Sequence, residues 1–177
     1  MKLNTIITAL LCALLLWSIH INEKAISELN HANEIIARQN KSIKEYSEML
    51  NSLVNELENT KLAEKDKKID LLARLINAEA GSELCCDEMK RLVGVVALNR
   101  VKSSEFPNTL EEVIYEQGQY ACVDDGNIKK TPTPVCYKIA RDLVINGYDD
   151  PTNIIFQGEF PQGKGVYKKI QNMYFCI

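Results

Sequence analysis

The sequence predicts an α+β fold, with a mainly helical domain carrying a short β element over residues 67–177. An N-terminal membrane helix and a long coiled-coil-like helix are expected to precede this domain. Three features support the prediction: an apolar run at the start, a seven-residue apolar repeat, and a last segment that alternates helical periodicity with Gly-rich turns and short aromatic stretches. A chain of 177 residues accommodates one domain of about 100 residues plus an extension.

The apolar run from Ile6 to Ile21 follows a single basic residue, Lys2, which is the layout of an export signal. As a helix it measures about 24 Å, short of the ~30 Å hydrocarbon core, so length alone does not separate an anchor from a cleaved signal. No small-x-small cleavage site stands near its end. We therefore expect residues 1–21 to be a signal anchor that leaves the C-terminal domain outside the cytoplasm. Secretion after cleavage of a signal peptide is the alternative.

Residues 22–66 are predicted to form a helical stalk, because they contain no Pro or Gly and repeat an apolar residue at every seventh position. The companion seam of a coiled coil is poor in either register, since polar residues occupy several of its positions. A weak homo-oligomer and a single solvated helix are therefore both open. The repeat consists of Leu29, Ile36, Ile43, Leu50 and Leu57.

The C-terminal domain is expected to begin within residues 58–70, which are charged and nearly devoid of apolar side chains. A helix from Asp70 to Ala80 should follow, with its apolar residues on one face and Gly81 after its last turn. Residues 89–101 are apolar around most of the circumference of a helix, which predicts a buried central helix.

Local capping and turn signals define the rest of the domain. Thr109 can cap a short helix whose first turn holds two glutamates, where the helix dipole favours them. Gly147 is placed to stop a later helix, and apolar and aromatic pieces between Gly-rich turns suit short strands. The expected elements are a helix at 110–115, a loop at 116–134, a helix at 135–146, and strands at 154–156 and 173–175.

Composition excludes several classes of function. The 21 Lys and Arg against 24 Asp and Glu give a net charge of −3 without a dense basic stripe, so nucleic acid is not an expected partner. Cys85 and Cys86 are adjacent rather than spaced as C-x-x-C, and both histidines precede the domain, so we predict no metal and no cofactor. Cys122 and Cys136 bracket a loop that a disulfide would stabilise by roughly 3 kcal/mol, but free thiols are equally open.

Glu79 breaks the apolar pattern of its helix. It lies at helical spacing after Leu72, Leu75 and Ile76, so its carboxyl continues their stripe onto the buried face. Desolvation disfavours the charged form and raises the pKa, which leaves an acid that is still protonated at working pH. The alternative is a solvated carboxyl at a frayed helix end beside Gly81.

An ordered series of motifs runs through the domain: residues 71–80, Glu83, 95–101, 106–109, 113–115, 118–120, Ala140, Gly147, 150–152 and 172–175. In this order the motifs resemble the SleB-like cell wall hydrolase family. The resemblance implies a lysozyme-like fold similar to lytic transglycosylases, peptidoglycan as substrate, and Glu79 as the counterpart of the catalytic glutamate. Departures occur around Cys85-Cys86, at Asn153-Ile154 in place of Gly-Gly, and at Met173 in place of a histidine.

Other matched residues have a functional and a structural interpretation. Gln119 and Tyr120 lie in a loop and are candidates to bind sugar by amide hydrogen bonds and ring stacking, or to anchor that loop. Tyr115 and Tyr174 are candidates to supply hydroxyls to the cleft, or are core tyrosines. Glu83, Asn99 and Arg100 are expected to support the site from beside it. Glu83 lies four residues after Glu79 and is expected to raise the pKa of Glu79.

The absence of a convincing second carboxylate in the motifs favours a lytic transglycosylase over a hydrolase, because both hydrolytic mechanisms need a second one. Asp124 or Asp125 is a candidate second acid for a hydrolytic muramidase or glucosaminidase. A membrane-tethered protein that only binds the wall is a third interpretation. The expected partners are peptidoglycan, the membrane through the N-terminal helix, and a second copy through the stalk.

Overall fold

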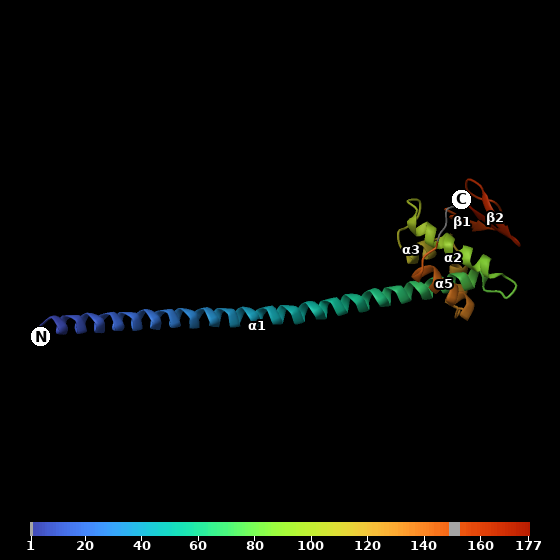
Figure 1. Cartoon of the computed structure of the whole chain (residues 1–177). Helices are drawn as coiled ribbons and strands as arrows, with labels where there is room; N and C mark the ends of the chain where they lie inside the picture. Colours follow the sequence, from blue (N-terminus) through green and yellow to red (C-terminus); the bar gives the residue numbers. More distant parts are fainter. Residues whose placement is uncertain (1, 149–152) are drawn as a thin grey trace. The chain divides into compact units, whose positions relative to one another are not determined.

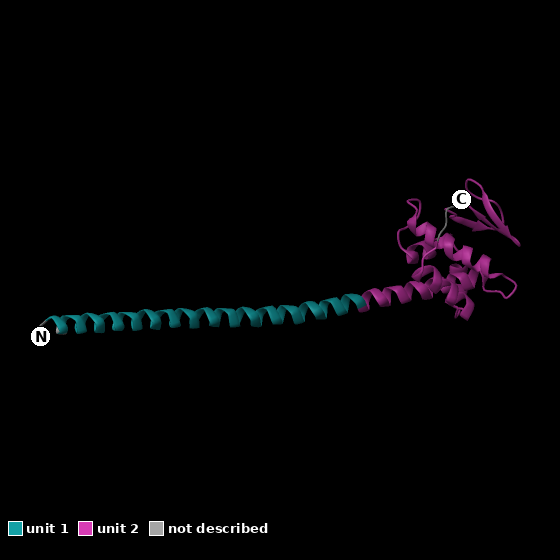
Figure 2. Ribbon diagram, in the orientation of Figure 1, with its two compact units in different colours: residues 1–58 teal, residues 59–177 magenta. Residues whose placement is uncertain are grey.

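The computed structural model describes residues 2–148 and 153–177. One long helix is followed by short helices and a small sheet (Figure 1), and the chain divides into two compact units, residues 1–58 and 59–177 (Figure 2). The elements are α1 (Lys2–Ala80), α2 (Asp87–Lys102), α3 (Leu110–Tyr115), α4 (Ala121–Asp124), a 3-10 turn (Asn127–Lys129), α5 (Pro134–Ile145), β1 (Phe156–Gly158), β2 (Val166–Ile170) and β3 (Met173–Cys176).

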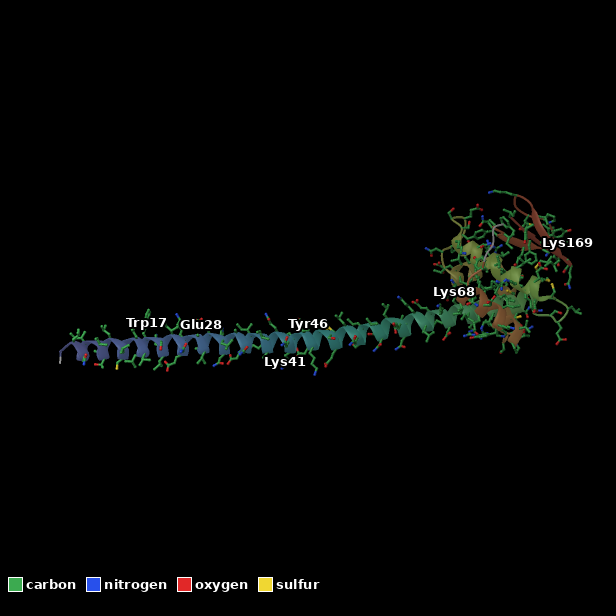
Figure 3. The ribbon with its side chains drawn as sticks, in the orientation of Figure 1. Trp17, Glu28, Lys41, Tyr46, Lys68 and Lys169 are labelled. Carbon is green, nitrogen blue, oxygen red and sulfur yellow. The ribbon has the colours of Figure 1, made fainter. Side chains whose placement is uncertain are left out.

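The first unit contains only the N-terminal part of α1, and its described side chains are all exposed (Figure 3). Trp17 and Tyr46, for example, keep 64% and 66% of their surface accessible. The five residues of the seven-residue repeat are exposed as well. By length and composition, this helix includes a segment apolar enough to cross a membrane.

α1 runs without interruption through residues 58–70, so the helix predicted to begin at Asp70 is in fact the end of α1. The prediction was wrong because this segment, although charged, contains no Pro or Gly that would end a helix. Burial along α1 starts at Ile69. From there the helix contributes the fully buried stripe of Leu72, Leu75 and Ile76 to the core.

α2 is the buried central helix that its sequence predicts, and it packs against α3, α5 and β1 (Figure 1). Gly94 makes close packing possible at its middle. A Cβ atom there would lie 2.6 Å from Leu143 Cδ1 on α5 and 3.0 Å from Ile76 Cδ1 on α1. The missing side chain therefore lets two helices approach α2 at the same level.

Local signals predicted two further helices correctly. Thr109 Oγ1 accepts a hydrogen bond from the Glu112 N–H at 3.2 Å, and α3 occupies the predicted residues. Thr133 caps α5 in the same way through the Cys136 N–H at 3.3 Å. Gly147 follows α5 with a φ of 74°, a conformation that costs glycine little.

The sheet has three antiparallel strands in the order β1-β3-β2, although only two strands were predicted. β2 was missed because Val166–Ile170 carries two lysines and is mostly exposed, so it lacks a buried apolar face. The segment 116–134, predicted to be a loop, contains α4 and the 3-10 turn. Helices of three or four residues leave too short a pattern to detect.

Candidate active site

Glu79 lies in the last turn of α1, one residue before its end, and its side chain is partly buried. The stripe on which it lies is the one that seats α1 in the core, so the fold itself turns this carboxyl inward. Burial is the largest influence on it and raises the pKa of Glu79 above its ordinary value. The carboxyl is therefore biased toward the protonated form that a general acid needs.

Two side chains hydrogen-bond to this carboxyl from distant parts of the sequence. The Gln157 amide on β1 donates from Nε2 to Glu79 Oε2 at 3.2 Å, and the Cys122 thiol on α4 is a second partner. Both bonds lower the pKa of Glu79, as does the charge of Arg100, while Asp125 raises it. Burial outweighs the lowering contributions, so the pKa remains raised.

Arg100 fixes a buried positive charge close to Glu79. Its guanidinium lies between two aromatic rings, 4.9 Å from the centroid of Phe106 and 5.1 Å from that of Tyr120. Its Nε donates to the Ile155 carbonyl at 2.7 Å, which ties α2 to the chain entering β1. One cation and two aromatic rings therefore pack together close to Glu79.

Three buried side-chain atoms in the described part of the chain have no hydrogen-bond partner, and all three belong to neighbours of Glu79. They are Arg100 Nη1, the Tyr120 hydroxyl and Gln157 Oε1. Burial raises the pKa of Tyr120 to about 12, so its hydroxyl keeps its proton. Buried polar groups without partners are rare in native proteins, so three of them beside one carboxyl distinguish this place from the rest of the core.

Tyr120 and Arg100, two of the residues singled out in the sequence, thus lie beside Glu79. Asn99 faces another way: its Nδ2 donates to the Ile154 carbonyl at 2.9 Å, and its Oδ1 accepts from the Tyr148 hydroxyl at 2.9 Å. Asn99 and Arg100 together hold residues 154–155 against α2. Gln119 is partly buried directly before Tyr120.

Three other candidates are exposed or make contacts elsewhere. Tyr115 is 49% exposed and contributes, less than Asp70 does, to the raised pKa of Arg74. Tyr174 pairs with Gly158 in the sheet, and Lys169 Nζ lies 4.5 Å from the centroid of its ring. Its side chain is on the face of the sheet opposite to that of its neighbour Phe175. Glu83 is exposed in the turn after α1, so the expected i+4 helical relation to Glu79 is wrong, because the helix ends at Ala80.

Cys122 and Cys136 are both buried free thiols, so the disulfide considered between them is absent. Cys122 instead faces Glu79. Burial, followed by the charge of Glu79, raises the pKa of Cys122 to about 12, which keeps it a thiol that can donate. The loop that these cysteines bracket is held by α4, the 3-10 turn and the Thr133 cap instead.

Sequence reasoning missed Gln157 as a site residue. It lies 78 positions after Glu79 and directly after the predicted strand 154–156, and nothing in the sequence connects it with that carboxyl. Within residues 2–148 and 153–177, no group of three or more His, Cys, Asp or Glu side chains is arranged to hold a metal ion.

The sequence comparison is decisive for the family, because residues 87–176 match the group described as Cell Wall Hydrolase. The chain belongs to the cell wall hydrolase family. Glu79 stands eight residues before the matched stretch. Spore cortex-lytic enzymes of Bacillus cereus and Bacillus subtilis are 34% and 30% identical to this chain over 115 residues.

Those alignments cover 61% of this chain but only 43% and 37% of the two relatives, so the chain spans less than half of their length. Among solved structures, the catalytic domain of the Bacillus cereus SleB protein is 32% identical with a TM-score of 0.53, covering 63% of this chain and 91% of that one. The catalytic domain of the germination-specific lytic transglycosylase SleB from Bacillus anthracis is 31% identical with a TM-score of 0.52, covering 62% and 93%. The mainly helical fold with a short sheet is confirmed.

Proposed function

We propose that residues 67–177 of this cell wall hydrolase family member cleave the glycan strands of peptidoglycan between N-acetylmuramic acid and N-acetylglucosamine, with Glu79 as general acid and base. The observation that carries the proposal is a partly buried carboxyl of raised pKa close to the buried guanidinium of Arg100, which can stabilise the ionised form. The names of the relatives point to the same substrate class.

In the proposed reaction, protonated Glu79 gives its proton to the glycosidic oxygen as the bond to the muramoyl C1 breaks. The resulting carboxylate then accepts the proton of the muramoyl C6 hydroxyl, whose oxygen closes on C1. The product is a 1,6-anhydro sugar, and Glu79 ends protonated as it began. Arg100, close to the carboxylate, stabilises the ionised state between the two steps.

Asp125 is the second carboxylate that bears on the choice of mechanism. It is close enough to raise the pKa of Glu79, but both of its oxygens already accept hydrogen bonds from Asn127, from the backbone N–H at 2.8 Å and from Nδ2 at 2.7 Å. A carboxylate that closes its own turn is poorly placed to attack a sugar or to activate a water. This favours the transglycosylase over a hydrolytic muramidase or glucosaminidase.

Mass spectrometry of peptidoglycan digested by the full chain tests the proposal. Fragments ending in 1,6-anhydromuramic acid are expected. Reducing ends alone would replace the transglycosylase with a hydrolase that uses the same acid. If no glycan is released, the domain is a wall-binding module and the proposal is wrong.

The N-terminal apolar segment is proposed to anchor the enzyme in the membrane, with the catalytic domain outside the cytoplasm. The full chain should then stay in the membrane fraction through washes with high salt and with carbonate, because apolar burial rather than surface charge holds it. A soluble chain beginning after about residue 27 would instead indicate cleavage of a signal peptide.

Residues 22–66 are proposed to self-associate through the exposed seven-residue repeat. Replacing Ile36 and Ile43, which are 52% and 64% exposed, with Lys should abolish association of this fragment in sedimentation equilibrium, because the charges would face each other in the seam. Glu34→Lys with Glu48→Lys adds two lysines off the seam and should leave association intact. If the fragment stays monomeric at high micromolar concentration, residues 22–66 form a single solvated helix and the proposed self-association is wrong.

A further inference from the structure

We propose that Gln157 is a positioning residue that holds the Glu79 carboxyl in both of its protonation states, by turning its side-chain amide between them. The inference rests on the proposed role of Glu79, which must act first as an acid and then as a base. A side chain that can hydrogen-bond to only one of these states would no longer hold the carboxyl once Glu79 has given up its proton.

The contact between Gln157 and Glu79 can serve both the carboxylate and the protonated carboxyl. Gln157 Nε2 donates to Glu79 Oε2 at 3.2 Å, which suits the carboxylate. Gln157 Oε1 is buried and has no partner, so a half-turn of the amide sacrifices no bond made by that oxygen. The two ends of an amide are nearly equal in size, and after the turn Oε1 can accept the proton carried by neutral Glu79.

The backbone around Gln157 is held while the amide turns. Gln157 is the middle residue of β1 and pairs with Phe175, a fully buried residue of β3. Two residues earlier, the Ile155 carbonyl accepts the bond from Arg100 Nε at 2.7 Å. The strand is thus fixed to both the sheet and α2, so only the side-chain torsions remain to change.

The other groups facing Glu79 are poorly suited to this exchange. Arg100 on α2 can only donate, and Asp125 after α4 accepts from Asn127. Cys122 on α4 is a weak donor and a weaker acceptor, and the buried Tyr120 hydroxyl faces the Arg100 guanidinium. An amide combines a full-strength donor with a full-strength acceptor, which is the pairing that the two states of a carboxyl require.

The test is Gln157→Met in the full chain, which keeps the length and removes both polar ends. Infrared difference titration, with Glu79→Gln as the blank, reports the ionisation midpoint of Glu79 without relying on activity. We expect the midpoint to rise, because the charge-assisted bond to the carboxylate is the stronger of the two that are lost. On the acid side of both midpoints, where Glu79 is protonated, the cleavage rate should still fall about tenfold.

Gln162→Met, a change of the same kind in the loop between β1 and β2, is the matched control and should alter neither quantity. A raised midpoint with an unchanged acid-side rate would overturn the two-state role, because Gln157 would then serve the carboxylate alone. An unchanged midpoint would overturn the contact itself. If Glu79 is not the catalytic acid, the result is different. Glu79→Gln would then keep its activity, whether or not the ionisation midpoint of Glu79 changes in Gln157→Met.

Gln157→Glu provides a second test if Gln157→Met does not fold. It places a second carboxyl at a contact of 3.2 Å, where two carboxyls share one proton. The infrared titration should then split into two steps that belong to the pair. A single step at the midpoint of the unmutated protein would show that the two side chains do not meet, and would overturn the proposal.

Discussion

Glu79→Gln is expected to lower glycan-strand cleavage by about 10²- to 10⁴-fold, the usual contribution of general acid–base catalysis. The amide has the size of the carboxyl but has no proton to give to the glycosidic oxygen. Activity of the unmutated enzyme should fall as the pH rises through the pKa of Glu79, which burial has raised. Release of soluble glycan from purified peptidoglycan over a pH series measures both effects.

The same substitution should make the domain more stable near neutral pH. The folded protein holds Glu79 at a raised pKa, so ionising this carboxyl costs folding stability at any pH above the pKa of an unfolded glutamate. Gln removes that cost. The gain should fade as the pH falls below the unfolded pKa, where the carboxyl is protonated in both states, and thermal melts at neutral and acidic pH check the sign.

Glu83→Gln is the matched control for Glu79→Gln, because it makes the same chemical change at an exposed turn residue four positions away. It should lose little activity and gain no stability. Near-normal activity of Glu79→Gln in a protein that melts cooperatively would refute the assignment of the acid.

Phe175→Ala is expected to lower the free energy of unfolding by about 3–5 kcal/mol, the usual cost of truncating a buried phenylalanine. Phe175 is fully buried on β3, the strand between β1 and β2, so the cavity would open where the sheet meets the helical core. Because Phe175 is also the cross-strand partner of Gln157, the site should lose order along with the sheet.

Urea denaturation of the two phenylalanine variants provides the measurement. Phe160→Ala removes the same ring from a position that is 66% exposed, and its effect should stay within about 0.5 kcal/mol. If Phe175→Ala is as mild as Phe160→Ala, then β3 does not close the core, and the position assigned to β1 beside Glu79 loses its support.

The helices were predicted where their signals are local. Thr109 and Gly147 act on their immediate neighbours, so α3 and the end of α5 followed from short stretches of sequence. The helix predicted to begin at Asp70 was wrong, because a solvated helix tolerates the charge of residues 58–70 and α1 continues through them. The division between the two compact units does fall at the start of this segment. β2 escaped notice because its identity as a strand depends on pairing with β3 rather than on an apolar face.

The residues of the site also differ in whether local sequence or distant contacts determine their positions. Glu79 could be found from the sequence because its inward direction is set by residues three, four and seven positions earlier on the same helix. Gln157 could not, since its contact with Glu79 exists only after β1 is seated against α2. Asn99 and Arg100 were understood as supports, but the backbone carbonyls that they bind became known only from the structure.

The order β1-β3-β2 has a consequence for when the enzyme is completed. In the described sheet β1 and β2 pair only with β3, which comes last of the three in the chain. Because β3 follows both strands in the chain, neither β1 nor β2 has a neighbour to pair with until residues 173–176 have been synthesised. Gln157 therefore reaches its fixed position beside Glu79 only after β3 has emerged, although both residues of the contact are made earlier.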